Sequence, residues 1–128
     1  MSELDIAPVV KQLSQEQVQR YADASSDHNP IHIDEDYARA TPFGGTIAHG
    51  MLILASISEM MAAACGEAWI TRGKLRVRFR APAKTSDTIT ASAKAQTPHN
   101  GARIYGVECR NQDGELLISG SAEVPLDG

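Results

Sequence analysis

The sequence predicts an α+β domain in which a curved antiparallel sheet wraps around one long buried helix. Residues 49–66 are apolar or small on nearly every side, which is typical of a buried helix. From Trp69 onward the pattern changes to an alternation with a period of two, which indicates half-buried strands. Turn signals at residues 100–101 and 111–114 join these strands, so we expect an antiparallel meander that packs on the helix.

The first helix is predicted in residues 13–25. Ser14 and Gln17 have the spacing of a capping box, and the apolar residues that follow recur at helical intervals. The helix must end before Pro30, because proline lacks an N–H group and clashes with the preceding turn. Residues 25–32, with the sequence SSDHNPIH, are therefore predicted to form a loop at the C-terminus of this helix.

Two further helices are predicted in the first half of the chain. A short one covers residues 35–40 with Asp34 as its N-cap, and it stops at the proline and glycines of residues 41–45. The long buried helix follows, and Gly66 supplies its C-terminal stop.

The second half of the chain is predicted to consist of strands. In residues 74–80, Leu75, Val77 and Phe79 form an apolar face that we expect to be buried, and basic residues form the other face. Three more strands are predicted at residues 86–96, 103–110 and 115–124.

Length and charge limit the function classes. A chain of 128 residues with 42% hydrophobic residues predicts one domain that spans residues 1–128. The formal net charge of -4 argues against a nucleic-acid partner, because such a protein must neutralise phosphates with a basic excess. We expect a small-molecule partner instead.

The cysteines and apolar runs indicate a cytoplasmic protein. Cys65 and Cys109 lie far apart and outside any CxxC spacing, which predicts neither a disulfide framework nor a zinc site. The first ten residues lack a basic region followed by an apolar core, so no signal peptide is expected. The longest apolar run, near residues 51–55, is too short to cross a bilayer, and no membrane partner is expected.

The predicted loop carries a candidate acid–base pair. Asp27 and His32 stand five positions apart, and Pro30 forces Asn29 into an extended conformation, so the two side chains are expected to converge. A carboxylate beside an imidazole can move protons near neutral pH. Asn29 is suited to hold the turn with its side-chain amide.

Two other interpretations of this loop are open. Aspartate, asparagine and proline are ordinary turn formers, and the histidines would then face solvent. Metal binding by Asp27, His28, His32 and His49 is the second alternative, but His28 and His32 cannot share a helical face across the proline. We therefore predict no metal.

A second group of residues stands where the buried helix begins. The segment FGGTIAHGM, residues 43–51, places Gly50 at the helix N-terminus, where backbone N–H groups lack intrahelical partners. These groups and the helix dipole favour developing negative charge, and glycine allows a ligand to approach. Alternatively, the glycines serve only turns and tight packing.

The segment YADASSDHNPIHIDEDYARATPFGGTIAHGM resembles the hydratase 2 signature of MaoC-like, (R)-specific enoyl-CoA hydratases and dehydratases. The resemblance continues in RGKLRVRFRAPAKTSDTIT and covers about residues 14–124. Ser26 departs from the pattern, because the family often has glycine before the aspartate. The residues that match the signature are Asp27, Asn29, Pro30, His32, Ala48, His49, Gly50 and Met51.

The resemblance implies a hot-dog fold, a homodimer or higher homo-oligomer with a continuous sheet, and a role in fatty-acid or polyester metabolism. It also implies a coenzyme A thioester substrate, with no cofactor: water adds to a trans-2-enoyl-CoA and gives an (R)-3-hydroxyacyl-CoA, or the reverse. Asp27 and His32 would hold the water, and the N–H of Gly50 would bind the thioester oxygen.

Further residues are candidates for binding the substrate. Arg76 and Arg78 belong to a basic stripe that either meets coenzyme A phosphates or is a solvated face. The other substrate-binding candidates are Asn29, His49, Met51, Ala55 and Ser56.

Three alternatives to the hydratase stay open. A dehydratase of carrier-protein thioesters would use the same chemistry. A hot-dog thioesterase would place its carboxylate on the central helix, where only Glu59 is available. A non-catalytic acyl-binding subunit should lack Asp27 or His32, and the chain has both.

Overall fold

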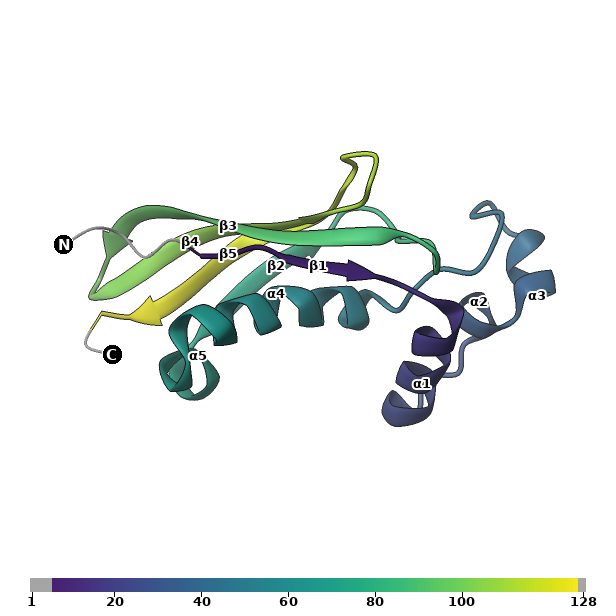
Figure 1. Cartoon of the computed structure of the whole chain (residues 1–128), viewed down its shortest axis with the longest axis horizontal. Coiled ribbons are helices and arrows are strands. Elements are labelled where there is room, and N and C mark those ends of the chain that lie inside the picture. Colours follow the sequence, from purple (N-terminus) through teal and green to yellow (C-terminus); the bar gives the residue numbers. More distant parts are fainter. Residues whose placement is uncertain (1–5, 127–128) are drawn as a thin grey trace.

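The computed structural model describes residues 6–126. One antiparallel sheet covers a long helix, α4 (Gly50–Cys65), and three short helices, α1 to α3, cluster near the end at which α4 begins (Figure 1). Residues 1–5 and 127–128 of the predicted domain lie outside the described residues. No helix in the described part of the chain is long and apolar enough to cross a membrane.

Helix α1 (Gln15–Ser25) confirms the predicted first helix. The Ser14 hydroxyl accepts a hydrogen bond from the backbone N–H of Gln17 at 3.1 Å, which satisfies one of the free donors of the first turn. Val18 and Ala22 are fully buried, so the amphipathic face packs inward as its spacing predicts.

The prediction of an unbroken loop over residues 25–32 was wrong. Residues Pro30–Ile33 form a single helical turn, α2, and Asn29 caps it with its side-chain oxygen, which accepts from the Ile31 N–H at 3.1 Å. Proline is compatible with this position, because the first helical residue needs no intrahelical N–H. Helix α3 (Glu35–Arg39) follows, capped by Asp34 as predicted.

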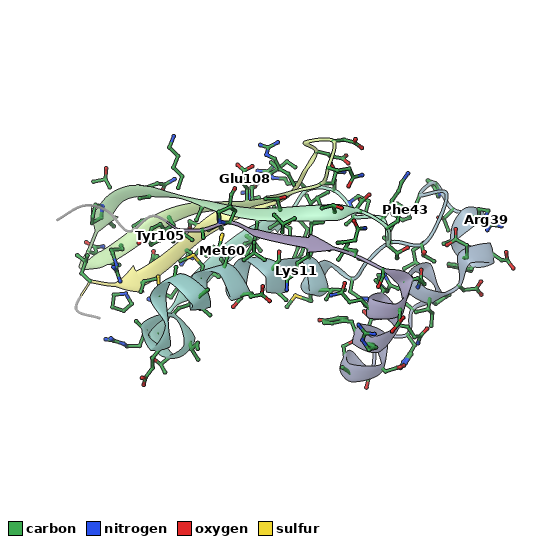
Figure 2. All side chains as sticks on the ribbon, viewed as in Figure 1. Lys11, Arg39, Phe43, Met60, Tyr105 and Glu108 are labelled. Carbon is green, nitrogen blue, oxygen red and sulfur yellow. The ribbon has the colours of Figure 1, made fainter. Side chains whose placement is uncertain are left out.

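Helix α4 is the centre of the core. Met60 of α4 and Tyr105 of the sheet are both buried between the two layers (Figure 2). The helix ends at Gly66, which has a φ of +59° that disfavours other residues. The fully or nearly fully buried apolar residues of this helix are Ile53, Ile57, Met60 and Met61.

The strand pattern was predicted to begin at Trp69, and this prediction was wrong. Residues Glu67–Arg72 form another helix, α5, on which Trp69 is buried and donates from Nε1 to the Ser58 hydroxyl at 3.1 Å. The period of two therefore starts only at Lys74. The large buried indole keeps this segment against α4 rather than in the sheet.

The sheet order corrects the predicted meander. The order is β1-β3-β4-β5-β2, and all neighbours are antiparallel, so only β3, β4 and β5 follow one another as a meander. The alternation of apolar and polar residues along a strand shows which face is buried but not which strands lie beside it. The place of β2 beside β5 was therefore not predictable from this pattern. The strands are β1 (Val9–Gln12), β2 (Lys74–Phe79), β3 (Thr88–His99), β4 (Ala102–Arg110) and β5 (Leu116–Pro125).

Strands β2 and β5 approach each other closely at Gly120, which pairs with Val77. A Cβ atom at Gly120 would lie 2.0 Å from the carbonyl oxygen of Arg76, so only glycine fits there. Leu75 and Val77 are half-buried toward the core as predicted, but Phe79 is 55% exposed. The expectation that Phe79 is buried was wrong, because the strand runs beyond the core and its last ring lies beside a cavity.

Candidate active site

The structure brings Asp27 and His32 together. Asp27 lies in the short connection between α1 and α2, and its Oδ2 is 4.0 Å from Nε2 of His32, which lies on α2. The His32 side chain is 12% exposed, whereas that of Asp27 is 53% exposed. A carboxylate at the solvent edge thus faces a largely enclosed imidazole.

Local hydrogen bonds explain why the chain bends at Asp27. Ser26 ends α1 in the left-handed conformation, with a φ of +64°, and turns the chain away from the helix. The Ser25 hydroxyl accepts from the Asp27 N–H at 3.2 Å, and Asp27 Oδ1 accepts from the Asn29 N–H at 3.3 Å. Asn29 has the extended conformation predicted for a residue before proline, with a φ of -56° and a ψ of 129°.

The backbone fixes the orientation of His32. Its Nδ1 lies 2.8 Å from the carbonyl oxygen of Ile47. A carbonyl oxygen can only accept, so Nδ1 carries a proton and donates it. In the neutral ring, Nε2 is then the unprotonated nitrogen, and it is the one that faces Asp27.

A polar network supports the helical turn of His32. The Gln15 side-chain amide donates to the His32 carbonyl at 2.8 Å. The buried Thr46 hydroxyl lies 2.8 Å from Gln15 Oε1 and 2.9 Å from Glu35 Oε2. Helix α1, helix α3 and the segment before α4 are thereby tied to the residue that presents the imidazole.

His49 lies directly beneath the pair. It is 2% exposed, its Nε2 donates to the carbonyl oxygen of Asp27 at 2.9 Å, and its ring stacks on His32 with centroids 3.8 Å apart. His49 is not part of the cavity lining among the described residues, which gives its predicted contact with substrate no support. Its hydrogen bond to Asp27 and its stacking on His32 stabilise the loop that carries the pair.

Asp27, His32 and His49 also have the residue types of a metal site, and one potential ligand atom of each lies within 4.8 Å of the others. Imidazole lone pairs lie in the plane of the ring. The two rings are inclined by only 25° and are stacked, so their lone pairs run in separate, nearly parallel planes rather than toward one ion. This donor set is a poor fit to a tetrahedral or octahedral metal.

A cavity of about 360 Å³ adjoins the pair. His32 and Gly50 both line it, so the imidazole and the N-terminus of α4 face the same space. Asp27 is not part of the lining among the described residues, and its Oδ2 lies 4.0 Å from Nε2 of His32, which is. The other lining residues are Phe43, Ile47, Ala48, Ile53, Phe79, Arg80, Ala81, Pro82, Ala83 and Ile118.

Gly50 is the first residue of α4, where the backbone N–H has no intrahelical partner. The ring of Phe79 lies over it, and a Cβ atom at Gly50 would be 3.0 Å from the nearest ring carbon. Because glycine has no side chain, the Gly50 N–H and the Phe79 ring can both border the same narrow part of the cavity.

None of the seven predicted substrate-binding residues lines the cavity within the described chain, and three of the seven belong to α4. Met51 is 58% exposed, Ala55 is also exposed, and Ser56 is buried and donates to the Ile53 carbonyl at 2.6 Å. The reason is geometric, because successive helical residues point about 100° apart and the cavity side of α4 is that of Gly50 and Ile53.

Sequence reasoning missed the aromatic walls. Phe43 and Phe79 come from the loop before α4 and from the end of β2, and both are about half exposed at the cavity (Figure 2 for Phe43). The sequence did contain a signal, because Phe79 stands at the end of a predicted strand and Phe43 stands beside the glycine pair of residues 44–45. Phe79 was expected to be buried, and no position was predicted for Phe43.

A model of the MaoC like domain family matches residues 6–114. The chain is 31% identical over 120 residues to an (R)-specific enoyl-CoA hydratase of Rhodospirillum rubrum, covering 92% of this chain and 83% of the relative. It is 30% identical over 120 residues to a 3-hydroxybutyryl-CoA dehydratase of Methylorubrum extorquens, covering 91% and 74%.

The solved structure of R-hydratase PhaJ1 from Pseudomonas aeruginosa superposes with a TM-score of 0.84 at 27% identity, covering 98% of this chain and 81% of that chain. The predicted hot-dog fold is thereby confirmed. Because the family model spans most of the chain, and because a relative above 30% identity is covered over most of its length, this protein belongs to the MaoC-like dehydratase family.

Proposed function

We propose that this protein is a hydro-lyase that adds water to trans-2-enoyl-CoA and gives (R)-3-hydroxyacyl-CoA, or catalyses the reverse dehydration. The observation that carries the proposal is the Asp27–His32 pair, 4.0 Å apart, beside a cavity that Gly50 also lines. The names of the relatives from Rhodospirillum rubrum and Methylorubrum extorquens support the same chemistry.

The separation of the pair suits one bound water. A direct hydrogen bond would need about 2.8 Å, whereas an oxygen about 2.8 Å from each group bridges a gap of 4.0 Å at a bond angle near 90°. Asp27 Oδ2 and His32 Nε2 would then hold the same molecule at the mouth of the cavity. The orientation of His32 by Ile47 keeps Nε2 available for it.

In the hydration step the water oxygen forms a bond to C3 as its proton passes to the pair, with Asp27 as the acceptor. The electrons of the double bond move onto the thioester oxygen, which becomes an enolate. The enolate reforms the carbonyl as the pair delivers to C2 the same proton that it took from water, because the resting His32 ring has no proton on Nε2 to give. One proton enters and one leaves, so the coupled pair returns to its starting state.

The N-terminus of α4 would meet the charge on the enolate oxygen. The N–H of Gly50 has no intrahelical partner, and the helix dipole adds positive potential at this end. A donor aimed at such an oxygen typically lowers the barrier by about 3 to 4 kcal/mol. Because the hydroxyl and the C2 proton come from one pair, addition is syn.

Two other assignments are less well supported. A dehydratase of carrier-protein thioesters would use the same pair and the same cavity. For a thioesterase, the available helix carboxylate is Glu59, which forms an ion pair with Lys11 at 3.0 Å and does not line the cavity among the described residues.

The free edge of β2 supports a homodimer. Within the described chain β2 pairs only with β5, so its other edge carries unpaired backbone groups. Antiparallel pairing of β2 with the same strand of a second copy would satisfy them and make one continuous sheet.

The proposal is tested by mixing the purified protein with crotonyl-CoA. We expect the absorbance of the conjugated thioester to fall without release of free thiol, and chiral analysis to give only (R)-3-hydroxybutyryl-CoA. Free thiol would make the protein a thioesterase, and an (S) product would contradict the assigned face of attack.

A further inference from the structure

A groove of about 280 Å³ lies on the outer face of the sheet between β2 and β5. Arg76 stands opposite Ser121 and Arg78 stands opposite Ser119 in the strand register, so each of these arginines has a serine as its cross-strand partner. Arg80 closes the row and donates from Nε to the Ser119 hydroxyl at 3.0 Å. The floor at Gly120 carries no side chain.

The groove concentrates positive charge in an acidic protein. Its lining contains three arginines and no carboxylate among the described residues, although the chain has a net charge of -4. A local field of this kind attracts anions regardless of the net charge.

Within the described residues these arginines also lack the ion pairs that several other cations have. Elsewhere, Lys11, Arg20, Arg39 and Arg110 each pair with an aspartate or glutamate within the described residues. Over the same residues no carboxylate forms an ion pair with the arginines of the groove. Glu108, which faces Ser119 across the register, is held by Arg110.

Arg80 connects the groove to the candidate active site, because it lines both the groove and the cavity of His32. From Arg80 to Arg76 the row extends about 13 Å along the strand, at about 3.3 Å per residue. A ligand with its reactive end in the cavity would therefore run past Arg80 over a row of guanidinium groups.

We propose that this groove binds the phosphate groups of coenzyme A, with Arg76, Arg78 and Arg80 as the cations and Ser119 and Ser121 as hydroxyl donors. The inference rests on the proposed function and names the part of the substrate that this surface recognises. Three guanidinium groups spread along the strand match the diphosphate and the 3′-phosphate of free coenzyme A. The phosphopantetheine arm of a carrier protein offers a single phosphodiester.

The test compares crotonyl-CoA with crotonyl-pantetheine, which has the same reactive group and no phosphate. In Arg76→Gln/Arg78→Gln we expect the KM for crotonyl-CoA to rise about tenfold or more per arginine, because charge-assisted hydrogen bonds are lost. The value of kcat/KM for crotonyl-pantetheine should stay within about twofold, since that substrate does not reach the groove.

Lys94→Gln is the matched control, because Lys94 is an exposed cation of the same sheet on β3, which β4 separates from the strands of the groove. We expect it to leave both substrates unchanged. In the wild type, added salt should raise the KM for crotonyl-CoA, and the double variant should lose that dependence.

Equal losses for both substrates, or none for either, would overturn the inference. A loss confined to a crotonyl-carrier protein would also overturn it in favour of carrier docking. Calorimetry with coenzyme A and with pantetheine separates this inference from the proposed function. If the wild type hydrates neither substrate, the function fails, yet tighter binding of coenzyme A that the double variant loses still supports the groove.

Discussion

The imidazole rings of His32 and His49 stack with centroids 3.8 Å apart and planes inclined by 25°. Each ring donates to a different backbone carbonyl, that of Ile47 for His32 and that of Asp27 for His49. The stacking therefore holds the His32 ring by its face, and the hydrogen bond from His49 holds Asp27 by its main chain. His49 positions both members of the pair without lining the cavity within the described chain.

We expect His49→Ala to lower kcat about 10- to 100-fold with little change in KM, because the pair loses its geometry while the cavity keeps its walls. His49→Gln retains a side-chain N–H donor and should recover part of kcat. Steady-state kinetics with crotonyl-CoA and thermal unfolding check this. A loss of kcat in His49→Ala that tracks only lost stability, with no recovery in the glutamine variant, would reduce His49 to a packing residue.

Asp27→Asn and His32→Ala should each lower turnover by at least about 100-fold while circular dichroism stays unchanged, as expected for the loss of a general acid or base. His28→Ala is the control in the same loop, because His28 is exposed and bonds Asp23 at 2.9 Å instead of the pair. Normal rates in either catalytic variant, or an equal loss in His28→Ala, would contradict the roles assigned to the pair.

The sequence predicted those parts of the fold that depend on neighbouring residues. The cap at Ser14, the buried helix and its stop at Gly66 were correct, because each depends on contacts within one or two turns. The position of β2 beside β5 depends on residues more than 35 positions apart, and strand β1 has only 4 residues, too few for a periodic pattern.

The same distinction holds at the site. The approach of Asp27 to His32 follows from the short bend at Pro30, so a segment of six neighbouring residues sufficed to predict it. The contact of His49 with the Asp27 carbonyl spans 22 positions, and the wall formed by Phe79 depends on where β2 ends relative to α4. Neither contact can be predicted from residues that are close together in the sequence.

Removal of metal ions should leave hydration unaffected. The stacked rings of His32 and His49 do not direct their lone pairs at one point, and the proposed mechanism uses the Gly50 N–H for the charge on oxygen. Assays before and after dialysis against EDTA should agree within error. Lost activity that returns with Zn²⁺ or Mn²⁺ would instead make Asp27, His32 and His49 a metal centre.

The two cysteines should react slowly and in a fixed order. Burial raises the pKa of the Cys109 thiol above its ordinary value of 9.0, and burial also raises that of Cys65, which is less enclosed. The thiolate is the reactive form, so iodoacetamide at pH 8 should modify Cys65 first and Cys109 only after urea is added. Mass spectrometry measures both.

The sign of the shift also fixes how Cys109 affects stability. Because its folded pKa is raised, the contribution is complete below pH 9.0 and is lost as the pH rises through the folded value. Rapid modification of Cys109 in the native state would show that the core opens locally on the time scale of the reaction.

Ser26→Gly should stabilise the protein and leave turnover unchanged. Ser26 adopts a φ of +64° at the end of α1, a conformation that costs other residues about 1 kcal/mol and that glycine adopts freely. After the entropy of the extra glycine is subtracted, we expect a gain of up to about 0.5 kcal/mol in urea unfolding. Ser25→Gly is the opposite control, because Ser25 is helical and its hydroxyl accepts from the Asp27 N–H, so it should destabilise α1 and lower turnover. A destabilised Ser26→Gly would mean that the left-handed cap is not strained.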